Sequence, residues 1–276
     1  MTEARNRLNA ALEALGIMAK RSLGQNFLVS DTVINKIIEQ VKAFEPEALI
    51  EVGPGPGALT DYLLEMKLPL QLIELDTTIA EYWRGKGLPV IEEDALRMDW
   101  KQFYNGKKLV FVSNLPYQIS SSIVIERSLE NVGVEHMVLM FQKEVAQRIR
   151  AAASTEHYGF LSVIAQTFWK IHTVVDAGPR DFDPPPRVMS RVLGFTRIES
   201  EVKNRKAFLT FVKVSYAQRR KLLKKNLSGL LNQRKLTEEQ VISWLEELGF
   251  KATARAEELS PAQMVKLYKH FGFEEE

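Results

Sequence analysis

Residues 48–66 read ALIEVGPGPGALTDYLLEM, and this stretch decides the fold. Its first five residues form an apolar run that is typical of a buried strand, and its last nine predict an amphipathic helix. The glycines between them allow a tight turn and let a ligand approach the backbone closely. Gly53, Gly55 and Ala58 fit the pattern G-x-G-x-x-A, which indicates a site for an adenosine-type cofactor at the start of the helix.

Two prolines in this loop indicate which kind of cofactor it binds. Pro54 and Pro56 carry no backbone N–H, whereas a loop that cradles a pyrophosphate uses such donors. The pattern therefore favours a cofactor without phosphates, of which S-adenosylmethionine is the common one. Glu74, at the end of the next predicted strand, is suitably spaced to hold ribose hydroxyls. A Gly-Pro turn with a purely structural role is the alternative.

Outward from the loop, short apolar runs alternate with helix-like stretches as far as residue 199. This alternation predicts an α/β fold with a doubly wound, Rossmann-like parallel sheet. Strands are expected at residues 48–52, 70–74, 88–92, 109–113 and 136–141, and helices at 58–66 and 120–130, with Asp31 capping a further helix.

The pattern changes beyond residue 200, where only helical stretches occur. They include capped helices at 237–249 and 260–272. We therefore predict a large domain over residues 1–199 and a small all-helical domain over residues 200–276. The first 19 residues form either a short amphipathic helix or a loose extension.

Polar groups follow two more of the predicted strands. Asp94 closes the third strand and can accept a hydrogen bond from an adenine amine, although such an aspartate is also a common helix cap. Residues 113–118, SNLPYQ, place an amide, a kink and an aromatic ring directly after the fourth strand. Asn-x-Pro is ordinary turn chemistry, but the same groups suit a planar ring that carries an amine. The carboxyl ends of parallel strands meet in one crevice, so we expect these groups beside the glycine loop.

Composition excludes several classes of site. The chain has 276 residues and no cysteine, which excludes disulfides, thiolate zinc sites and cysteine nucleophiles. Its four histidines are scattered without ligand spacing, so no metal is expected. No apolar run approaches the ~20 residues of a membrane span, and the N-terminus lacks a signal-peptide pattern, so we expect a cytoplasmic protein.

Charge is distributed unevenly along the chain. Residues 203–235 hold eleven Lys or Arg and no acid, which leaves 26 basic and 35 acidic residues elsewhere, a net charge of −9. Within this segment, the spacing predicts a helix with leucines on one face and a basic face formed by Arg219, Arg220, Lys221 and Lys224. Such a run can be a solvated face, but the lack of any acid favours contacts with a polyanion.

A set of motifs along the chain resembles the ribosomal RNA adenine dimethyltransferase family, and most closely its bacterial small-subunit branch. In order, they are KRSLGQNFL (20–28), EVGPGPGALT (51–60), IELD (73–76), DAL (94–96), NLPY (114–117) and FDPPPRV (182–188). The resemblance runs from about Lys20 to the C-terminus and includes the basic segment. It implies N6,N6-dimethylation of adjacent adenines in the 3′-terminal hairpin of small-subunit rRNA.

The resemblance also assigns roles at the cofactor site. S-Adenosylmethionine is the implied cofactor, without a metal, and the implied partner of a monomeric enzyme is rRNA within a pre-ribosomal small subunit. From its residue type, Gly24 is expected to bend the chain just before Asn26. The implied cofactor-binding residues are Asn26, Leu28, Gly53, Gly55, Glu74, Asp94 and Asn114.

NLPY then has a catalytic interpretation. The Asn114 side chain and the Leu115 carbonyl would accept hydrogen bonds from the adenine amine and direct its lone pair at the methyl group. Tyr117 offers a face for the extruded base, and the Pro-rich segment would hold Phe182 against the base from the opposite side. A rigid connector between domains is the alternative role for that segment.

Small departures from the family pattern concern RNA contacts. They are Gln118 in place of the usual Asn, Phe160 in place of Arg, and Arg187 in place of Lys. Rival functions are a large-subunit rRNA adenine methyltransferase, a DNA adenine methyltransferase and an RNA-binding assembly factor on a methyltransferase fold. An NAD-dependent oxidoreductase fits the glycine loop but leaves NLPY and the basic segment unexplained.

Overall fold

A computed structural model describes residues 2–16, 26–104, 106–130 and 133–273. It divides the chain into two compact units. The first comprises Met1–Arg127, Asn131–Ala146 and Ile171–Arg197, and the second comprises Ser128–Glu130, Gln147–Lys170 and Ile198–Glu276. The second unit is therefore not the continuous segment 200–276 that the sequence predicts, because two earlier stretches belong to it as well.

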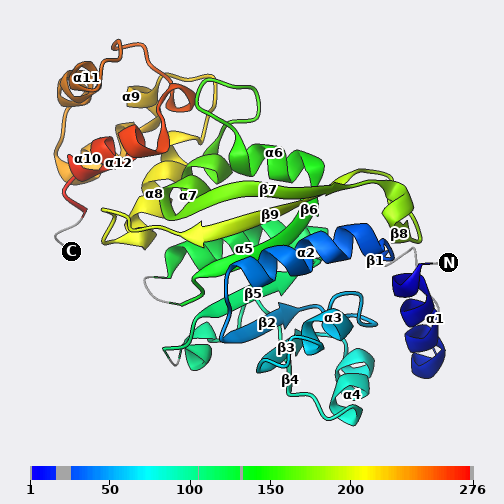
Figure 1. Ribbon diagram of the computed structural model, residues 1–276. Helices are drawn as coiled ribbons and strands as arrows, with labels where there is room; N and C mark the ends of the chain where they lie inside the picture. The colour runs from blue at the N-terminus through cyan, green and yellow to red at the C-terminus, as the bar shows by residue number, and fades with distance from the viewer. Residues whose placement is uncertain (1, 17–25, 105, 131–132, 274–276) are drawn as a thin grey trace. The chain divides into compact units, whose positions relative to one another are not determined.

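The first unit is built on a seven-stranded sheet, drawn in Figure 1. Its strand order is β4-β3-β2-β5-β6-β9-β7. The strands are β2 (Ala48–Val52), β3 (Leu70–Glu74), β4 (Val90–Glu92), β5 (Leu109–Ser113), β6 (His136–Gln142), β7 (Trp169–Ala177) and β9 (Ser190–Arg197). The five strands from β2 to β6 pair in parallel, which confirms the doubly wound α/β fold.

One strand departs from the predicted parallel arrangement. β9 pairs with β6 in the antiparallel direction, with Gln142 opposite Ser190 and His136 opposite Thr196. The sheet is thus mixed, and its extension by β7 and β9 was not among the expected strands. Because β9 runs against its neighbour, its first residue lies at the edge where the parallel strands end.

Apolar side chains on both faces hold the sheet between helices. On β5, Val110 and Val112 belong to the apolar cluster that also contains Ile34 and Ile37 of α2 (Asp31–Ala43). Phe111, between the two valines, packs instead near Trp100, with ring centroids 5.2 Å apart. This alternation follows from the pleat of a strand and explains the continuous apolar run in the sequence.

The other helices of the first unit follow the strands closely. They are α1 (Glu3–Leu15), α3 (Thr60–Leu64), α4 (Thr77–Gly85) and the 3₁₀ turns Trp100–Phe103 and Pro179–Asp181. Two further helices, α5 (Tyr117–Leu129) and α6 (Lys143–Arg150), begin in the first unit and end in the second. The predicted helices at 58–66 and 120–130 correspond to α3 and α5.

The N-terminal helix α1 is tied to the first unit by side-chain contacts. The Thr2 hydroxyl donates to the Val29 carbonyl over 2.7 Å. The Asp31 carboxylate accepts from the N–H groups of Glu3 and Ala4 at 3.1 and 2.9 Å. Of the two alternatives for the N-terminus, the structure has the helix. Asp31 was wrongly expected to cap its own helix, because its carboxylate instead satisfies N–H groups at the start of α1.

A second, two-stranded sheet joins distant parts of the first unit. β1 (Phe27–Leu28) pairs with β8 (Phe182–Asp183) in the antiparallel direction. In Figure 1 this pair and α1 lie at the end of the large sheet toward which the parallel strands run. An ion pair of 2.9 Å between Arg5 and Asp183 links α1 to β8. The bend predicted at Gly24 lies outside the described residues.

The second unit is helical, as predicted for the C-terminal part of the chain. It contains α7 (Phe160–Phe168), α8 (Arg205–Ser215), α9 (Leu223–Asn226), α10 (Ser228–Arg234), α11 (Glu238–Glu247), the 3₁₀ turn Ala256–Glu258 and α12 (Pro261–Lys269). Thr237 and Ser260 cap α11 and α12 with complete capping boxes, which confirms both predicted starts. Among the described helices, none is long and apolar enough to cross a membrane.

Candidate functional site

A cavity of about 500 Å³ lies in the first unit, where β2, β3 and β5 end. Its lining includes seven of the residues that the sequence nominates. They are Asn26, Gly53, Gly55, Glu74, Asn114, Leu115 and Tyr117. Their convergence follows from the parallel sheet, which brings the carboxyl ends of neighbouring strands to one edge.

The glycine loop forms one wall of this cavity. Gly53, Gly55 and Gly57 have φ values of +65°, +53° and +104°, which side chains with a Cβ rarely adopt. The indole N–H of Trp83 donates to the Gly55 carbonyl over 2.8 Å and supports the loop from α4. A Cβ on Gly57 would lie 3.0 Å from the Trp83 ring, so both the conformation and the close approach require glycine there.

Glu74 ends β3 and is nearly buried. Its Oε1 accepts from the N–H groups of Leu75 and Asp76 at 2.8 and 2.9 Å, which fixes the carboxylate at the cavity wall. Burial raises the pKa of Glu74, while these N–H groups and that of Gly55 oppose the shift. The arrangement presents a held carboxylate to a ligand in the cavity.

Glu51 is a cavity residue that the sequence interpretation missed. It is 2% exposed, and burial raises the pKa of its carboxyl to about 8. Nearby Asp61 and Glu74 raise it further, and the Thr60 side chain opposes the shift. Its Oε2 has no hydrogen-bond partner among the residues that the structure describes. The available signal was an acid inside the otherwise apolar run 48–52, since a buried acid without a function is costly.

Acidic groups dominate the charge around the cavity. Glu51, Glu74 and Asp76 line it, whereas the described lining residues include no Lys or Arg. Such a lining disfavours phosphate groups and suits a cation. The donor set therefore fits a positively charged nucleoside without phosphates.

The NLPY segment connects β5 to α5 at the cavity, beside the glycine loop, since a Cβ on Gly53 would lie 3.7 Å from Pro116 Cδ. Just before it, the Ser113 hydroxyl donates to the Val52 carbonyl over 2.5 Å and joins the ends of β5 and β2. Tyr117 is the first residue of α5, and its hydroxyl lies 2.8 Å from Ser190 Oγ. Asn114 is partly exposed and lines the cavity together with Tyr117. The segment thus places an amide and an aromatic ring in the same cavity as the glycine loop.

Three nominated residues of the first unit do not line the cavity. Leu28 and Phe182 are buried opposite each other in the β1–β8 pair, at 0% and 2% exposure. Asp94 Oδ1 accepts from the Leu96 N–H at 2.9 Å, and Arg97 Nε lies 3.5 Å from Oδ2. Asp94 therefore caps the turn after β4 in this structure. The ring of Phe182 belongs to the apolar core, so its predicted presentation to a base was wrong for this conformation.

The basic segment of the second unit also differs from its prediction. Arg219, Arg220 and Lys221 lie in the turn between α8 and α9, and not on one long helix, because helix α9 begins only at Leu223. The Asn226 side chain donates to the carbonyls of Ser215 and Gln218, at 2.8 and 3.1 Å, and holds this turn. The predicted apolar side does exist, since Leu223, Leu227 and Leu230 are buried.

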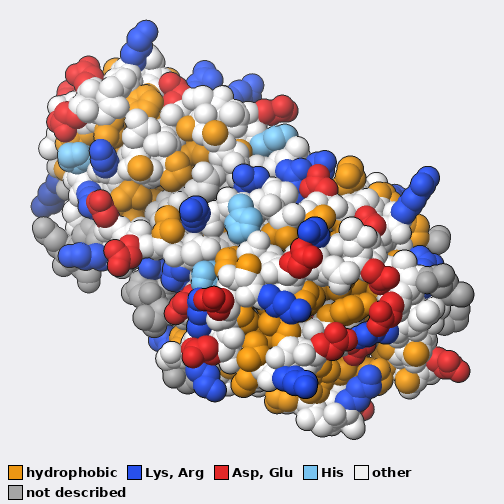
Figure 2. Space-filling view, viewed as in Figure 1, with side chains coloured by type: hydrophobic (Ala, Val, Ile, Leu, Met, Phe, Trp, Pro, Cys, Tyr) orange, Lys and Arg blue, Asp and Glu red, His pale blue; other side chains and the backbone are white. Residues whose placement is uncertain are grey.

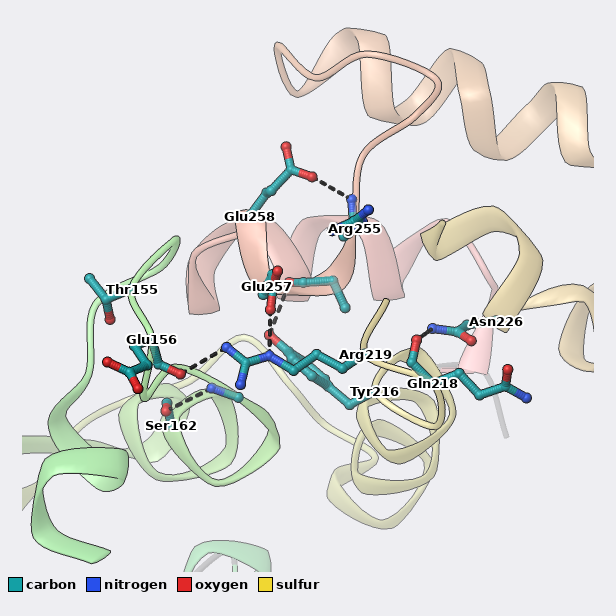
Figure 3. Close-up of polar contacts among 12 residues, drawn as sticks. Thr155, Glu156, Ser162, Tyr216, Gln218, Arg219, Asn226, Arg255, Glu257 and Glu258 are labelled. Carbon is teal, nitrogen blue, oxygen red and sulfur yellow. Dashed lines mark hydrogen bonds and ion pairs between the residues drawn. The ribbon is translucent and has the colours of Figure 1, made fainter. Parts of the chain in front are cut away.

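The basic side chains of this turn have different surroundings. Figure 3 shows the Arg219 guanidinium between the Glu257 carboxylate and the Glu156 carbonyl, which it approaches to 2.5 and 2.8 Å. Arg220 and Lys221 are exposed and form no ion pair with any residue that the structure describes. Lys224 is partly exposed. In Figure 2, Lys and Arg side chains stand beside acidic ones over the helical unit.

Comparison with known proteins places the chain in a family. The family model described as ribosomal RNA adenine dimethylase matches residues 16–272. Ribosomal RNA small subunit methyltransferase A of Bdellovibrio bacteriovorus is 77% identical over 274 residues, covering 99% of this chain and 100% of that protein. The protein of the same name from Staphylococcus haemolyticus is 32% identical, covering 96% of this chain and 94% of its own.

Solved structures agree on the fold. A dimethyladenosine transferase from Plasmodium falciparum matches with a TM-score of 0.74 and 23% identity, covering 90% of this chain and 98% of that one. The 23S rRNA methyltransferase ErmE matches with a TM-score of 0.64, also at 23% identity, over 90% of this chain and all of the other. From the family model and these relatives, we conclude that the chain belongs to the ribosomal RNA adenine dimethylase family.

Proposed function

We propose that this protein transfers methyl groups from S-adenosylmethionine to N6 of adjacent adenines in the 3′-terminal hairpin of small-subunit rRNA. It does so twice per adenine, as a cytoplasmic monomer acting on assembling small subunits. One observation carries the proposal: the glycine loop, Glu74 and NLPY line the same acidic cavity. Membership of the family and the 77% identical relative support the choice of rRNA.

The cavity fits the cofactor by charge and by hydrogen bonding. S-Adenosylmethionine supplies an electrophilic methyl group on a sulfonium centre. Asp76 places a carboxylate beside a cationic ligand, and the buried Glu51 carboxyl, whose pKa is raised, can ionise when such a ligand binds. Glu74 offers its fixed carboxylate to two ribose hydroxyls. Gly53, in its left-handed conformation, lets the methionine end approach the backbone. Asn26 closes the pocket beside Phe27.

Leu28 and Asp94 act less directly in this proposal. Leu28 is wholly buried in β1 and supports the neighbouring Asn26 and Phe27 through its place in the core. Asp94 stands at the end of β4, and its carboxylate would have to exchange its contact with Leu96 for the adenine amine. Gly55, whose carbonyl accepts a hydrogen bond from Trp83, shapes the glycine loop.

Asn114 and Leu115 act on the nucleophile. An aromatic amine is a poor nucleophile because its lone pair is delocalised into the ring. Two acceptors aimed at its hydrogens favour a tetrahedral nitrogen and direct the lone pair toward the methyl group. The Asn114 side-chain oxygen and the Leu115 carbonyl supply them, and Pro116 fixes the turn that follows. No general base is needed, because the cationic product can lose its proton afterwards.

Tyr117 receives the base once it has left its stack. Its ring lines the cavity and is partly exposed, so a base can stack on it, which contributes roughly 1–3 kcal/mol. Phe182 supports this region from the core and does not face the base. The second unit contributes phosphate contacts through Arg220, Lys221 and Lys224, while Arg219 holds the turn that carries them.

Methyl transfer from labelled cofactor to three substrates tests the proposal. Small subunits, large subunits and DNA are supplied unmethylated, and the modified nucleosides are then identified. We expect N6,N6-dimethyladenosine in the small subunit alone. Methylation of the large subunit or of DNA would assign the protein to a rival function. RNA binding without transfer to any of the three would indicate an assembly factor.

A further inference from the structure

Tyr117 is held at its far end by a residue that no motif includes. Its hydroxyl lies 2.8 Å from Ser190 Oγ. Ser190 is completely buried, so its hydroxyl has lost contact with water and needs a partner within the protein. Tyr117 is at the same time partly exposed at the cavity, with its ring in the position proposed for stacking.

The direction of β9 brings Ser190 to this place. Ser190 is the first residue of β9 and lies opposite Gln142, the last residue of β6. Because β9 is antiparallel to β6, its start coincides with the edge that carries the cavity. The residue before it is fixed as well, since the Lys143 N–H donates to the Met189 carbonyl over 2.9 Å. Ser190 is therefore a rigid anchor point on the sheet.

The backbone of Tyr117 is fixed from the helix side. The Ser120 hydroxyl donates to the Tyr117 carbonyl over 2.9 Å, one turn into α5. With the backbone held, a tyrosine ring retains two side-chain torsions, and the terminal one is broad in energy. A bond at the hydroxyl restrains the first torsion, because that torsion swings the oxygen sideways, whereas the second turns the ring about an axis through the same oxygen. The bond therefore fixes where the ring stands at the cavity wall.

We propose that Ser190 is a positioning residue, which holds the Tyr117 ring at the place in the cavity wall where it receives the target adenine. This inference rests on the proposed function. Ser190 touches neither base nor cofactor and acts only through the Tyr117 hydroxyl. Its contribution belongs to the step after RNA binding, because a preset ring orients the extruded base for attack. Cofactor affinity should not depend on it.

Four variants test this relationship: Ser190→Ala, Tyr117→Phe, the double variant, and Ser190→Thr. Single-turnover methyl transfer is measured with small subunits and cofactor both saturating, and RNA and cofactor affinities are measured separately. Loss of one hydrogen bond should slow transfer about five-fold in each single variant. Because both variants remove the same bond, the double variant should also be about five-fold slower. Ser190→Thr retains a hydroxyl and should restore most of the rate.

Thr196→Val provides the matched control. Thr196 is on the same strand, and its hydroxyl lies 3.3 Å from His136 Nδ1, away from the cavity. This variant should transfer at the wild-type rate. Thermal unfolding is recorded for every variant. If Ser190→Ala does not fold, the comparison of the two separate variants Tyr117→Phe and Ser190→Thr decides the question.

Two results would overturn the inference. One is multiplicative loss in the double variant, about 25-fold, which would show that the hydroxyls act independently. The other is an unchanged rate in Tyr117→Phe, which would leave the bond a structural contact of the buried serine. Failure of the proposed function is recognised separately, because the wild-type protein would then not methylate small subunits.

Discussion

Arg219 and Glu257 form an ion pair in the helical unit, with Arg219 Nε 2.5 Å from Glu257 Oε2, while the adjacent Arg220 is exposed. Arg219 also donates to the Glu156 carbonyl, so it joins three separate stretches of this unit. Two neighbouring arginines therefore have different tasks, one within the protein and one available to a partner.

The first prediction separates these two tasks. Arg219→Ala should lower the free energy of unfolding by about 1–2 kcal/mol, since a partly exposed ion pair and one further hydrogen bond are lost. Arg220→Ala together with Lys221→Ala should leave thermal unfolding unchanged. The Arg220→Ala and Lys221→Ala double variant should instead reduce the slope of log RNA affinity against log salt concentration by about 0.7–0.9 for each phosphate contact that is lost. An equal loss of slope in Arg219→Ala would show that Arg219 also contacts phosphate.

Asn114→Ala should abolish most of the methyl transfer. Its side chain acts mainly as the amine approaches the transition state, so the loss is expected in the rate and not in RNA affinity. Removal of one preorganised polar group of this kind costs about 10²–10³ in rate. The measurement is single-turnover transfer to small subunits with saturating cofactor. Wild-type rates in this variant would mean that NLPY is only a turn.

Glu74→Gln should weaken cofactor binding by about ten- to a hundred-fold, because the charged acceptor for two ribose hydroxyls is lost. Glu92→Gln is a matched control, since Glu92 is the register partner of Glu74 on β4 but pairs with Arg84 and Thr77. Calorimetric titration with the cofactor should distinguish the two variants. Equal cofactor affinities of the two variants would show that Glu74 does not hold the ribose.

Glu51 predicts a pH dependence of stability. Burial raises the pKa of its carboxyl from about 4.5 to about 8. Between these values the folded protein holds a proton that the unfolded chain has released, so the free energy of unfolding falls as pH rises. Glu51→Gln should flatten this dependence by up to about 1.4 kcal/mol per pH unit. Urea unfolding between pH 5 and 8 measures it, and parallel curves for both proteins would contradict the assignment.

The strands around the cavity could be predicted because each is a continuous apolar run with a clear end. β2, β3 and β5 match their predicted residues. β7 and β9 were not predicted. Most residues of β7 are only half-buried, so it lacks a continuous apolar run. The antiparallel direction of β9 depends on its pairing with β6, which the residues of one strand do not reveal. The supposed basic helix failed for another reason. Its leucines are buried by tertiary contacts, and Asn226 stabilises a turn that helical spacing cannot reveal.

The convergence of residues on one cavity could be predicted where a motif joins a strand end, as at Gly53, Glu74 and Asn114. The environment of each side chain could not be predicted from the sequence. The sequence places Phe182 in a Pro-rich segment, but only the pairing of β8 with β1 shows that its ring is buried. Ser190 and Glu51 were overlooked because one follows that segment without any motif and the other lies inside an apolar strand.

The pairing of β1 with β8 makes one wall of the cavity depend on a strand that is synthesised much later than the rest of the cavity. Phe27 lines the cofactor cavity, yet its partner strand is made only when synthesis has reached Asp183, and the anchor for Tyr117 follows at Ser190. A nascent chain emerges with its glycine loop, Glu74 and Asn114 well before these late strands. Until they arrive, the chemical groups exist without their enclosing wall. A chain made only as far as Asn114 thus holds the groups proposed for the chemistry, whereas the wall and the anchor need residues up to Ser190 of the 276.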